Sequence, residues 1–303
     1  MEKIKGKVDE EITYKNGVVI KIKNKTIFLD PIVSNNLSIV SHAHLDHSPY
    51  LTLTPPLTTK ETEELIKVRE PSFKAISIKQ NKKIKFEEFS LKFIDANHIL
   101  GSSMILIEND EKILYTGDFR KKEIDEDVDT LIIETTYGLP DLVFPPLEEE
   151  IEKMIKWIKL NNLHGKKVEI GAYALGKAQE IIKILNENNI FPSVSRTIEK
   201  FNEVYRKFGV KLETERKSDV TIRPLHEVIY KPLPNYAHCL LSGWGIINRF
   251  PFKTFIISDH LDFKGLLEFV ENLNPKKIYT IHGYSKEFAN YLEKIGYKAF
   301  SLV

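Results

Sequence analysis

Six consecutive residues decide how this sequence is expected to fold: His42-Ala43-His44-Leu45-Asp46-His47. They follow an apolar run at residues 37–40, which predicts a short buried strand. On a strand their side chains would alternate between two faces, and on a helix they would spread around most of the circumference. A tight loop after the strand can instead gather three imidazoles and a carboxylate, which are ligands that suit zinc and similar divalent ions. We therefore interpret the stretch as a metal site rather than as a His-rich surface loop.

The bulk composition predicts a soluble protein of the cytoplasm. The 303 residues, 42% hydrophobic and 29% charged, suggest two domains or one elaborated domain with a substantial core. The formal net charge of +1 excludes attraction of the whole protein to nucleic acid, so any such binding needs a local patch. Cys239 is the single cysteine, which excludes an internal disulfide and indicates a reducing compartment. Residues 1–10 lack the apolar core of a signal peptide, and no apolar run is long enough to span a bilayer, so we expect no membrane partner.

Further site-type residues follow predicted strands along the chain. An Asn16-Gly17 hairpin and a strand at 26–29 precede the His-rich stretch, and a helix from 59 to 68 follows it. Functional side chains placed at the ends of rigid strands are a common way to build a site. We therefore expect the following residues to join it: His98 after a strand at 91–94, Asp118 after 113–116, Glu134 after 131–133, His260 after 255–258 and His282 after 277–281.

The composition changes after Gly138, where several prolines predict a connector. A helix is predicted over 147–160, then a strand at 168–171, a helix that ends near 188 and a strand–helix unit at 191–208. This alternation indicates a small α/β module at about 139–250. The Gly176-Lys177 pair at a predicted helix start is a weak signal for a phosphate cradle.

The ordered motifs resemble those of a known fold. The His42-x-His44-x-Asp46-His47 stretch, His98 in Asn-His-Ile-Leu-Gly-Ser and Asp118 in Gly-Asp-Phe are similar to the ligand motifs of the metallo-β-lactamase fold. Glu134, His260 and His282 are similar to three further signatures of its β-CASP branch, which includes the mRNA cleavage-and-polyadenylation nuclease, Artemis and ribonuclease J. Over essentially the whole chain, the sequence most resembles the ligase-associated and 3′-end-processing-like DNA exonucleases of that branch. Asn97 stands where many relatives have Gly, and the cap is shorter than in RNA-processing members.

The resemblance implies an α/β architecture with two domains. Residues 1–138 and 251–303 would form the metallo-β-lactamase domain, an αββα sandwich that holds a dinuclear metal site at one edge. Residues 139–250 would form an inserted small α/β domain, the β-CASP cap.

The resemblance also implies a role for each matched residue. His42, His44, His98 and Asp118 would hold one metal ion, and Asp46, His47, Asp118 and His282 the other, with Asp118 bridging the two. The ions would be Zn²⁺, with Mn²⁺ as the alternative, and would activate water for hydrolysis of a phosphodiester bond.

Two further groups of residues complete the expected site. His260 would donate a proton or hydrogen bond to the leaving oxygen, and Glu134 would orient its ring, so Asp46, Glu134 and His260 are the expected catalytic residues. Ser102, Tyr173 and Lys177 are expected to contact backbone phosphate or to stack on a base. The remaining histidines, His164, His226 and His238, are expected to be structural or exposed.

We expect a metal-dependent DNA exonuclease, and with it nucleic acid and DNA-repair partners. RNA 3′-end processing, by exo- or endonucleolytic cleavage, is the alternative, because His282 is shared with RNA-type members. A small-molecule hydrolase of the same fold would not need Glu134, His260 or the cap, and a non-catalytic nucleic-acid-binding subunit is a third class. The sequence leaves open the strandedness, the polarity of digestion, the metal in the cell and the oligomeric state.

Overall fold

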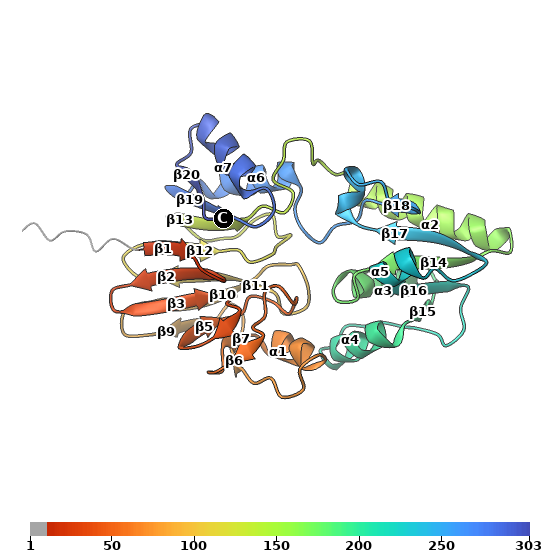
Figure 1. Cartoon of the computed structure of the whole chain (residues 1–303), viewed down its shortest axis with the longest axis horizontal. Coiled ribbons are helices and arrows are strands. Elements are labelled where there is room, and N and C mark those ends of the chain that lie inside the picture. The colour runs from red at the N-terminus through yellow and green to blue at the C-terminus, as the bar shows by residue number, and fades with distance from the viewer. Residues whose placement is uncertain (1–10) are drawn as a thin grey trace, which may run out of the picture.

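The computed structural model of the chain describes residues 11–303. The expectation for residues 1–10 lies outside the described residues. Figure 1 shows two lobes side by side, one built from both ends of the described chain and one from its middle.

The first lobe contains two sheets that pack face to face. The first sheet has the order β1-β2-β3-β5-β7-β8: β1 (Glu11–Tyr14), β2 (Val18–Ile22), β3 (Lys25–Leu29), β5 (Leu37–Ile39), β7 (Leu57–Thr58) and β8 (Ile76–Ser77). The second has the order β20-β19-β13-β12-β11-β10-β9: β9 (Lys83–Lys85), β10 (Ser90–Asp95), β11 (Ser103–Glu108), β12 (Lys112–Tyr115), β13 (Thr130–Glu134), β19 (Lys277–Ile281) and β20 (Ala299–Ser301). A short pair, β4 (Val33–Ser34) and β6 (Leu51–Thr52), lies in the connections.

Alternating side chains of the second sheet fill two separate cores. Ile105 and Ile107 of β11 point toward the first sheet, whereas Met104 and Leu106 pack against the helices on the other face. Those helices are α6 (Phe263–Leu273) and α7 (Ser285–Lys294), and α1 (Lys60–Lys67) follows the first sheet's strand β7. Two packed sheets with α6 and α7 on the far face of the second agree with the expected metallo-β-lactamase sandwich, so the fold prediction is confirmed, whereas the buried side chains of α1 join the core of the second lobe.

The second lobe is the expected α/β module. A parallel sheet of order β15-β16-β14-β17-β18 lies among four helices (Figure 1). Its elements are α2 (Leu147–Leu163), β14 (Lys167–Ala172), α3 (Lys177–Glu187), β15 (Ser193–Val194), α4 (Arg196–Lys207), β16 (Val220–Pro224), α5 (Leu225–Tyr230), β17 (Tyr236–Leu241), the 3₁₀ helix η1 (Gly243–Ile246) and β18 (Lys253–Phe255). We call this lobe the cap.

One predicted strand is shorter than expected. The strand predicted at 255–258 ends at Phe255, because the backbone N–H of Ile256 donates to Glu150 Oε2 of α2 at 2.9 Å instead of continuing the sheet. The division of the chain into two domains stays a prediction. The parallel pairing of β18 with β17 favours placing the second cap boundary after Phe255 rather than at residue 250.

Within residues 11–303, no helix combines the length and the apolar composition that a bilayer crossing requires.

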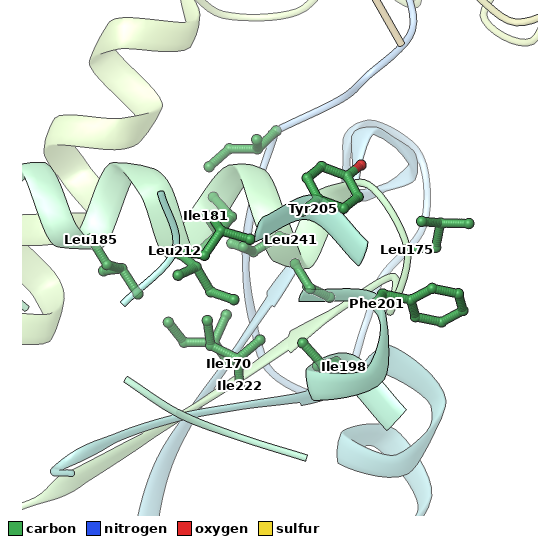
Figure 2. Close-up of a cluster of buried hydrophobic side chains, with 14 of the residues drawn as sticks. Ile170, Leu175, Ile181, Leu185, Ile198, Phe201, Tyr205, Leu212, Ile222 and Leu241 are labelled. Carbon is green, nitrogen blue, oxygen red and sulfur yellow. The ribbon is translucent and has the colours of Figure 1, made fainter. Parts of the chain in front are cut away.

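The apolar core of the cap, part of which Figure 2 shows in close-up, continues into the first lobe through residues such as Leu65 and Ile66 of α1. Ile170 lies in the middle strand β14, is fully buried, and pairs in register with Ile222 of β16 and Cys239 of β17. Replacing Ile170 with Ala leaves a cavity that neighbouring strands cannot close. We expect Ile170→Ala to lower the free energy of unfolding by about 2–5 kcal/mol in urea denaturation.

Leu163, at the end of α2, is the matched control because 80% of its surface is exposed. Leu163→Ala should change stability by less than about 0.5 kcal/mol. Equal effects of the two substitutions would contradict the packing described for the cap.

Candidate metal centre

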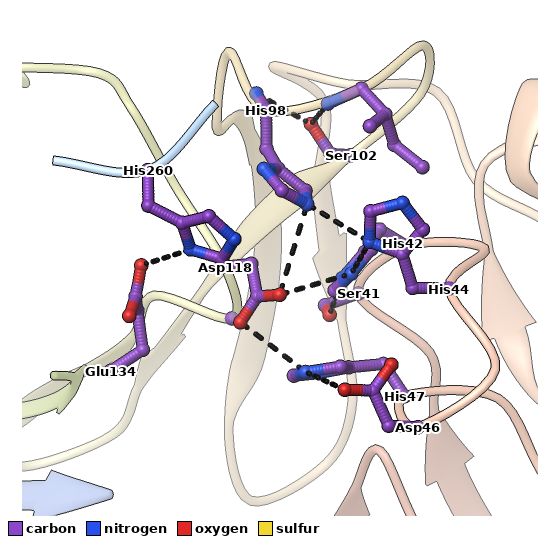
Figure 3. A network of polar contacts seen from close by, with 12 residues as sticks. Ser41, His42, His44, Asp46, His47, His98, Ser102, Asp118, Glu134 and His260 are labelled. Atoms are coloured by element: carbon purple, nitrogen blue, oxygen red, sulfur yellow. Dashed lines mark hydrogen bonds and ion pairs between the residues drawn. The ribbon is translucent and has the colours of Figure 1, made fainter. Parts of the chain in front are cut away.

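The predicted site residues meet where the two lobes face each other. Asp118 and His282 follow β12 and β19, and Glu134 ends β13 between them, so three parallel neighbours end together. The loop after β5 joins the same edge, because Ser41 O accepts the backbone N–H of Ser103 at 2.9 Å. Figure 3 shows the resulting group of imidazoles and carboxylates.

Four side chains form a compact set of donors: His42, His44, His98 and Asp118. His44 Nδ1 lies 3.1 Å from both His42 Nε2 and His98 Nε2, and Asp118 Oδ2 lies 3.4 Å and 3.7 Å from the same two nitrogens. A tetrahedral zinc ion with ligands at about 2.0–2.1 Å places its donors roughly 3.3 Å apart. The structure therefore brings together the first predicted ligand group with spacings that fit a zinc ion.

Carbonyl oxygens of the second lobe and of the segment after it fix two of these ligands. His98 Nδ1 lies 2.9 Å from Asp259 O, and His44 Nε2 lies 3.2 Å from Leu175 O. A carbonyl oxygen only accepts hydrogen bonds, so each of these nitrogens carries the proton of the neutral ring. The other nitrogen of each ring, with its lone pair, faces the centre of the site.

Burial keeps these ligands in the form that binds metal. Desolvation lowers the pKa of His42 well below its ordinary value, lowers the pKa of His44, and lowers the pKa of His98 to about 3. Ligating imidazole must be neutral. Burial raises the pKa of Asp118, but nearby imidazoles, His47 first, outweigh it and lower this pKa well below its usual range.

The second predicted ligand group is more open. His47 Nε2 lies 3.2 Å from Asp118 Oδ1, the oxygen that is turned away from the first group, and 4.0 Å from Asp46 Oδ2. The ring of His282 lies 5.1 Å from that of His47. The Asp46 side chain is 81% exposed, so this group is not closed around a single point in the way that the first is. Asp118 therefore has one oxygen toward each group, as a bridging carboxylate requires.

A buried carboxylate that the sequence analysis missed supports both groups. Asp30 Oδ2 accepts hydrogen bonds from His47 Nδ1 at 2.8 Å, Tyr115 Oη at 2.8 Å and Ser41 Oγ at 2.6 Å. Because Ser41 gives its hydroxyl proton to Asp30, Ser41 Oγ is free to accept from His42 Nδ1, 3.0 Å away. Asp30 directly follows a predicted strand, as the predicted ligands do. This position was the one feature of the sequence that could have indicated a place in the site.

His260 and Glu134 form a pair at the side of the metal ligands. His260 Nδ1 lies 2.9 Å from Glu134 Oε1, and Glu134 Oε2 accepts the backbone N–H of Thr136 at 2.8 Å. Burial lowers the pKa of His260, but the negative charges of Glu134 and Asp118 and the hydrogen bond to Glu134 raise it to about 9. The structure thus gives His260 an oriented ring with a proton to donate.

The three residues expected to contact substrate differ in their exposure and in whether they border the pocket. Tyr173 is 47% exposed and Lys177 borders the same pocket, although its ammonium group is buried and lies 3.2 Å from Asp259 Oδ1. Ser102 does not face the pocket. It is fully buried, and its hydroxyl oxygen accepts the backbone N–H groups of His98 and Ile99. Its contact with substrate stays a prediction, and the structure shows that Ser102 closes the turn that carries His98.

The pocket beside these residues has a volume of about 480 Å³ and draws its lining from both lobes. The first lobe contributes predicted metal ligands such as Asp46, Asp118 and His282, and the cap contributes Tyr173, Lys177 and Trp244. The segment that carries Asp259 and His260 completes it. A polymer or small molecule in this pocket would touch the ligands and the cap together. Asp259 was also missed by the sequence analysis, although it directly precedes His260.

Asp30→Asn tests whether the buried carboxylate supports metal binding. The variant keeps the size of the side chain but removes the charge that His47, Ser41 and Tyr115 face. Loss of such an outer partner lowers metal affinity about 10–100-fold. Competition with a chromophoric zinc chelator measures this change, and Asp110→Asn, in an exposed turn between β11 and β12, is the control. An unchanged affinity in Asp30→Asn would contradict the role of Asp30.

Comparison with known proteins finds several similar metallo-hydrolases and nucleases. A model of the Zn-dependent metallo-hydrolase RNA specificity domain matches residues 252–302. The "Probable DNA ligase" of Opitutus terrae is 28% identical over 302 residues, which is 91% of this chain and 29% of the ligase. The "Probable RNase MJ4" of Methanocaldococcus jannaschii is 31% identical over 208 residues, 53% of this chain and 48% of that protein. The 5′ exonuclease Apollo of Rattus norvegicus is 31% identical over 163 residues, 46% of this chain and 30% of Apollo.

The chain spans less than half the length of each of these three relatives. A crystal structure of a protein of unknown function from Enterococcus faecalis V583 superimposes with a TM-score of 0.70 at 15% identity, covering 96% of this chain and 97% of the other, which shows the fold. Together with the ordered His, Asp and Glu residues at the edge of the sandwich, these likenesses support a metallo-β-lactamase fold of the β-CASP type for this chain.

Proposed function

We propose that the chain is a metal-dependent nuclease that hydrolyses phosphodiester bonds, and that its first substrate is DNA, which it degrades from an end. The observation that carries the proposal is the position of Asp118. Its two carboxylate oxygens face two separate groups of imidazoles, and the His260–Glu134 pair lies beside them in the same pocket. Two adjacent metal sites and a proton donor are what in-line displacement at phosphorus requires.

The donor set supports two divalent ions, and we propose Zn²⁺ with Mn²⁺ as the alternative. His42, His44 and His98 with Asp118 would hold one ion, and Asp46, His47 and His282 with the other oxygen of Asp118 would hold the second. When bound, such ions act as Lewis acids on the phosphoryl oxygens and lower the pKa of water. Imidazole nitrogen and carboxylate oxygen are ligands that zinc accepts, and the described residues bring no thiolate to the site.

The protein groups contribute orientation and a proton. Glu134 holds Nδ1 of His260 and keeps the opposite nitrogen, Nε2, toward the pocket, where it donates to the oxygen that leaves phosphorus. Asp46 is the most exposed of the proposed ligands, so it can adjust when substrate enters. Lys177 supplies positive charge at the floor of the pocket, partly balanced by Asp259. Tyr173 offers an exposed ring beside it.

The choice of DNA rests on the likeness that covers most of this chain, the "Probable DNA ligase" of Opitutus terrae. The same likeness is the reason for proposing partners in DNA repair. RNA is the second candidate substrate, because residues 252–302 match the RNA specificity domain model and 53% of this chain resembles "Probable RNase MJ4". A cytoplasmic location is consistent with the reduced, fully buried Cys239.

End-labelled single-stranded DNA and RNA of matched sequence, with Zn²⁺ or Mn²⁺ added, test this function. Stepwise shortening of DNA supports the proposal, and the label that disappears first gives the polarity. Preferential shortening of RNA supports the second candidate. If neither polymer is cleaved with either metal, the nuclease proposal is overturned and a small-molecule hydrolase becomes the better interpretation.

His260→Ala tests the proton donor within the same assay. Removal of a general acid lowers the rate of the chemical step by about 10²–10⁴-fold. Zinc content should be unchanged, because His260 belongs to neither proposed ligand group. His226→Ala, an exposed position on α5, should cleave at the unmodified rate. A His260→Ala protein that retains full activity would show that the leaving oxygen takes its proton from another source.

A further inference from the structure

Three neighbouring cap strands end at the metal centre. β14, β17 and β18 are parallel and adjacent, so their carboxyl ends lie along one edge of the cap sheet. The residues that follow them are Tyr173, the run Ser242-Gly243-Trp244 and the segment 257–260. All three border the pocket that also contains the metal ligands. Open parallel sheets bind ligands beyond the carboxyl ends of their strands.

Aromatic contacts hold Trp244 in place at this edge. Its ring lies 4.8 Å from that of Tyr137 and 6.4 Å from that of Tyr284, measured between centroids. Tyr137 is itself almost completely buried and lies 6.0 Å from the ring of His260. The indole is therefore connected to the proton donor by one intervening ring.

The backbone around Trp244 is also constrained. Ser242 Oγ accepts the backbone N–H of Trp244 at 3.2 Å. A Cβ at Gly243 would lie 2.5 Å from Tyr137 Oη, so a larger residue there would push the segment away from Tyr137. The position of Trp244 is thus set before any ligand arrives, which reduces the entropy lost on binding.

A purely structural role would explain why Trp244 has aromatic neighbours, but not why its side chain is partly exposed at the pocket. Tyr137 is covered by protein, whereas Trp244 remains partly exposed and borders the pocket, as does the half-exposed Tyr173. Nucleic acid whose phosphate lies at the metal ligands would bring a neighbouring base toward these rings. Stacking of bases on aromatic side chains is a general mode of single-strand binding, and it tolerates every base.

We propose that Trp244, together with Tyr173, forms a nucleobase-stacking subsite that receives an unpaired base next to the scissile phosphate. The inference rests on the proposed nuclease function and specifies its substrate as a single-stranded or frayed end. A base in a duplex is already stacked and paired, so occupying this subsite would require its strand to open.

Tryptophan fluorescence tests the contact without any cleavage. The chain contains two tryptophans, Trp157 and Trp244. Trp157 lies in α2, where it packs against Phe255, and does not border the pocket. In metal-free Trp157→Phe protein, a single-stranded oligodeoxyribonucleotide should quench the emission of Trp244. In metal-free Trp244→Phe protein, the emission of Trp157 should not change. The proposal would be overturned if the oligonucleotide quenched the emission of Trp157 alone. It would also be overturned if the oligonucleotide bound to the protein without quenching either tryptophan.

An abasic substrate tests the energetic role of the base. Removing the bases nearest the cleaved end should lower kcat/KM of the unmodified protein by about tenfold, as expected for one lost base stack. Trp244→Leu should lower kcat/KM on the normal substrate by a similar factor and should be insensitive to the abasic change. Trp244→Phe, which keeps an aromatic face, should retain most activity.

If Trp244→Leu and the abasic change each lower kcat/KM and their effects multiply when combined, the two act independently. That result would overturn the proposal and leave Trp244 a structural role. The outcome is separate from that of the proposed function. Cleavage by the unmodified protein with no effect of Trp244→Leu would remove the subsite and keep the nuclease, whereas no cleavage by the unmodified protein would remove the nuclease.

Discussion

The site depends on one constraint: the ring nitrogen that carries the proton must face away from the centre, so that the nitrogen with the lone pair faces it. A neutral histidine has one N–H and one lone pair, and only the lone pair binds metal. Nε2 points inward in three rings, because Nδ1 contacts Ser41 Oγ in His42, Asp30 Oδ2 in His47 and Asp259 O in His98. In His44 the inward atom is Nδ1, because Nε2 contacts Leu175 O. Two of these outer acceptors, Leu175 O and Asp259 O, lie in the cap or in the segment that returns from it. The cap therefore contributes to the shape of the metal centre as well as to the pocket above it.

The backbone around the ligands takes conformations that regular strands do not allow. Asn97 and His282 have φ angles of 54° and 58°, in the left-handed region that Asn tolerates better than most residues. Asn97 therefore fits the turn that precedes His98. Gly283 follows His282 at φ 48°, and a Cβ there would lie 2.4 Å from Thr135 O. Strands packed on both faces can hold such turns, and strained backbone of this kind is frequent at functional sites.

The sequence predicted which His and Asp residues cluster in the structure because their signal is local, and their role as ligands stays a prediction. Clustered His and Asp residues directly after apolar runs identify both the strand and the site, and the sandwich and the position of the cap follow from the same ordered motifs. Long-range contacts were not predictable in this way. Residue types do not indicate which backbone carbonyl will contact a histidine, as those of Leu175 and Asp259 do. The strand that ends at Phe255 is ended by Glu150, which lies on a helix far away in the sequence. Ser102 is polar but buried, because its hydroxyl oxygen accepts hydrogen bonds from backbone N–H groups. Asp30 has the same strand-end position as the ligands but no His beside it in the sequence.

The arrangement separates two tasks between the lobes. The sandwich holds the predicted ligands, and metal ions bound to them would engage a phosphate without distinguishing one base or sugar from another. The carboxyl edge of the cap sheet presents Tyr173 and Trp244, whose rings can recognise an unpaired base but not its identity. The whole chain carries a net charge of only +1, and Lys177, which borders the pocket, has a buried ammonium group 3.2 Å from Asp259 Oδ1. If the chain acts on nucleic acid as proposed, contacts with the sugar would have to come from other groups that border the pocket between the predicted metal ligands and the two rings.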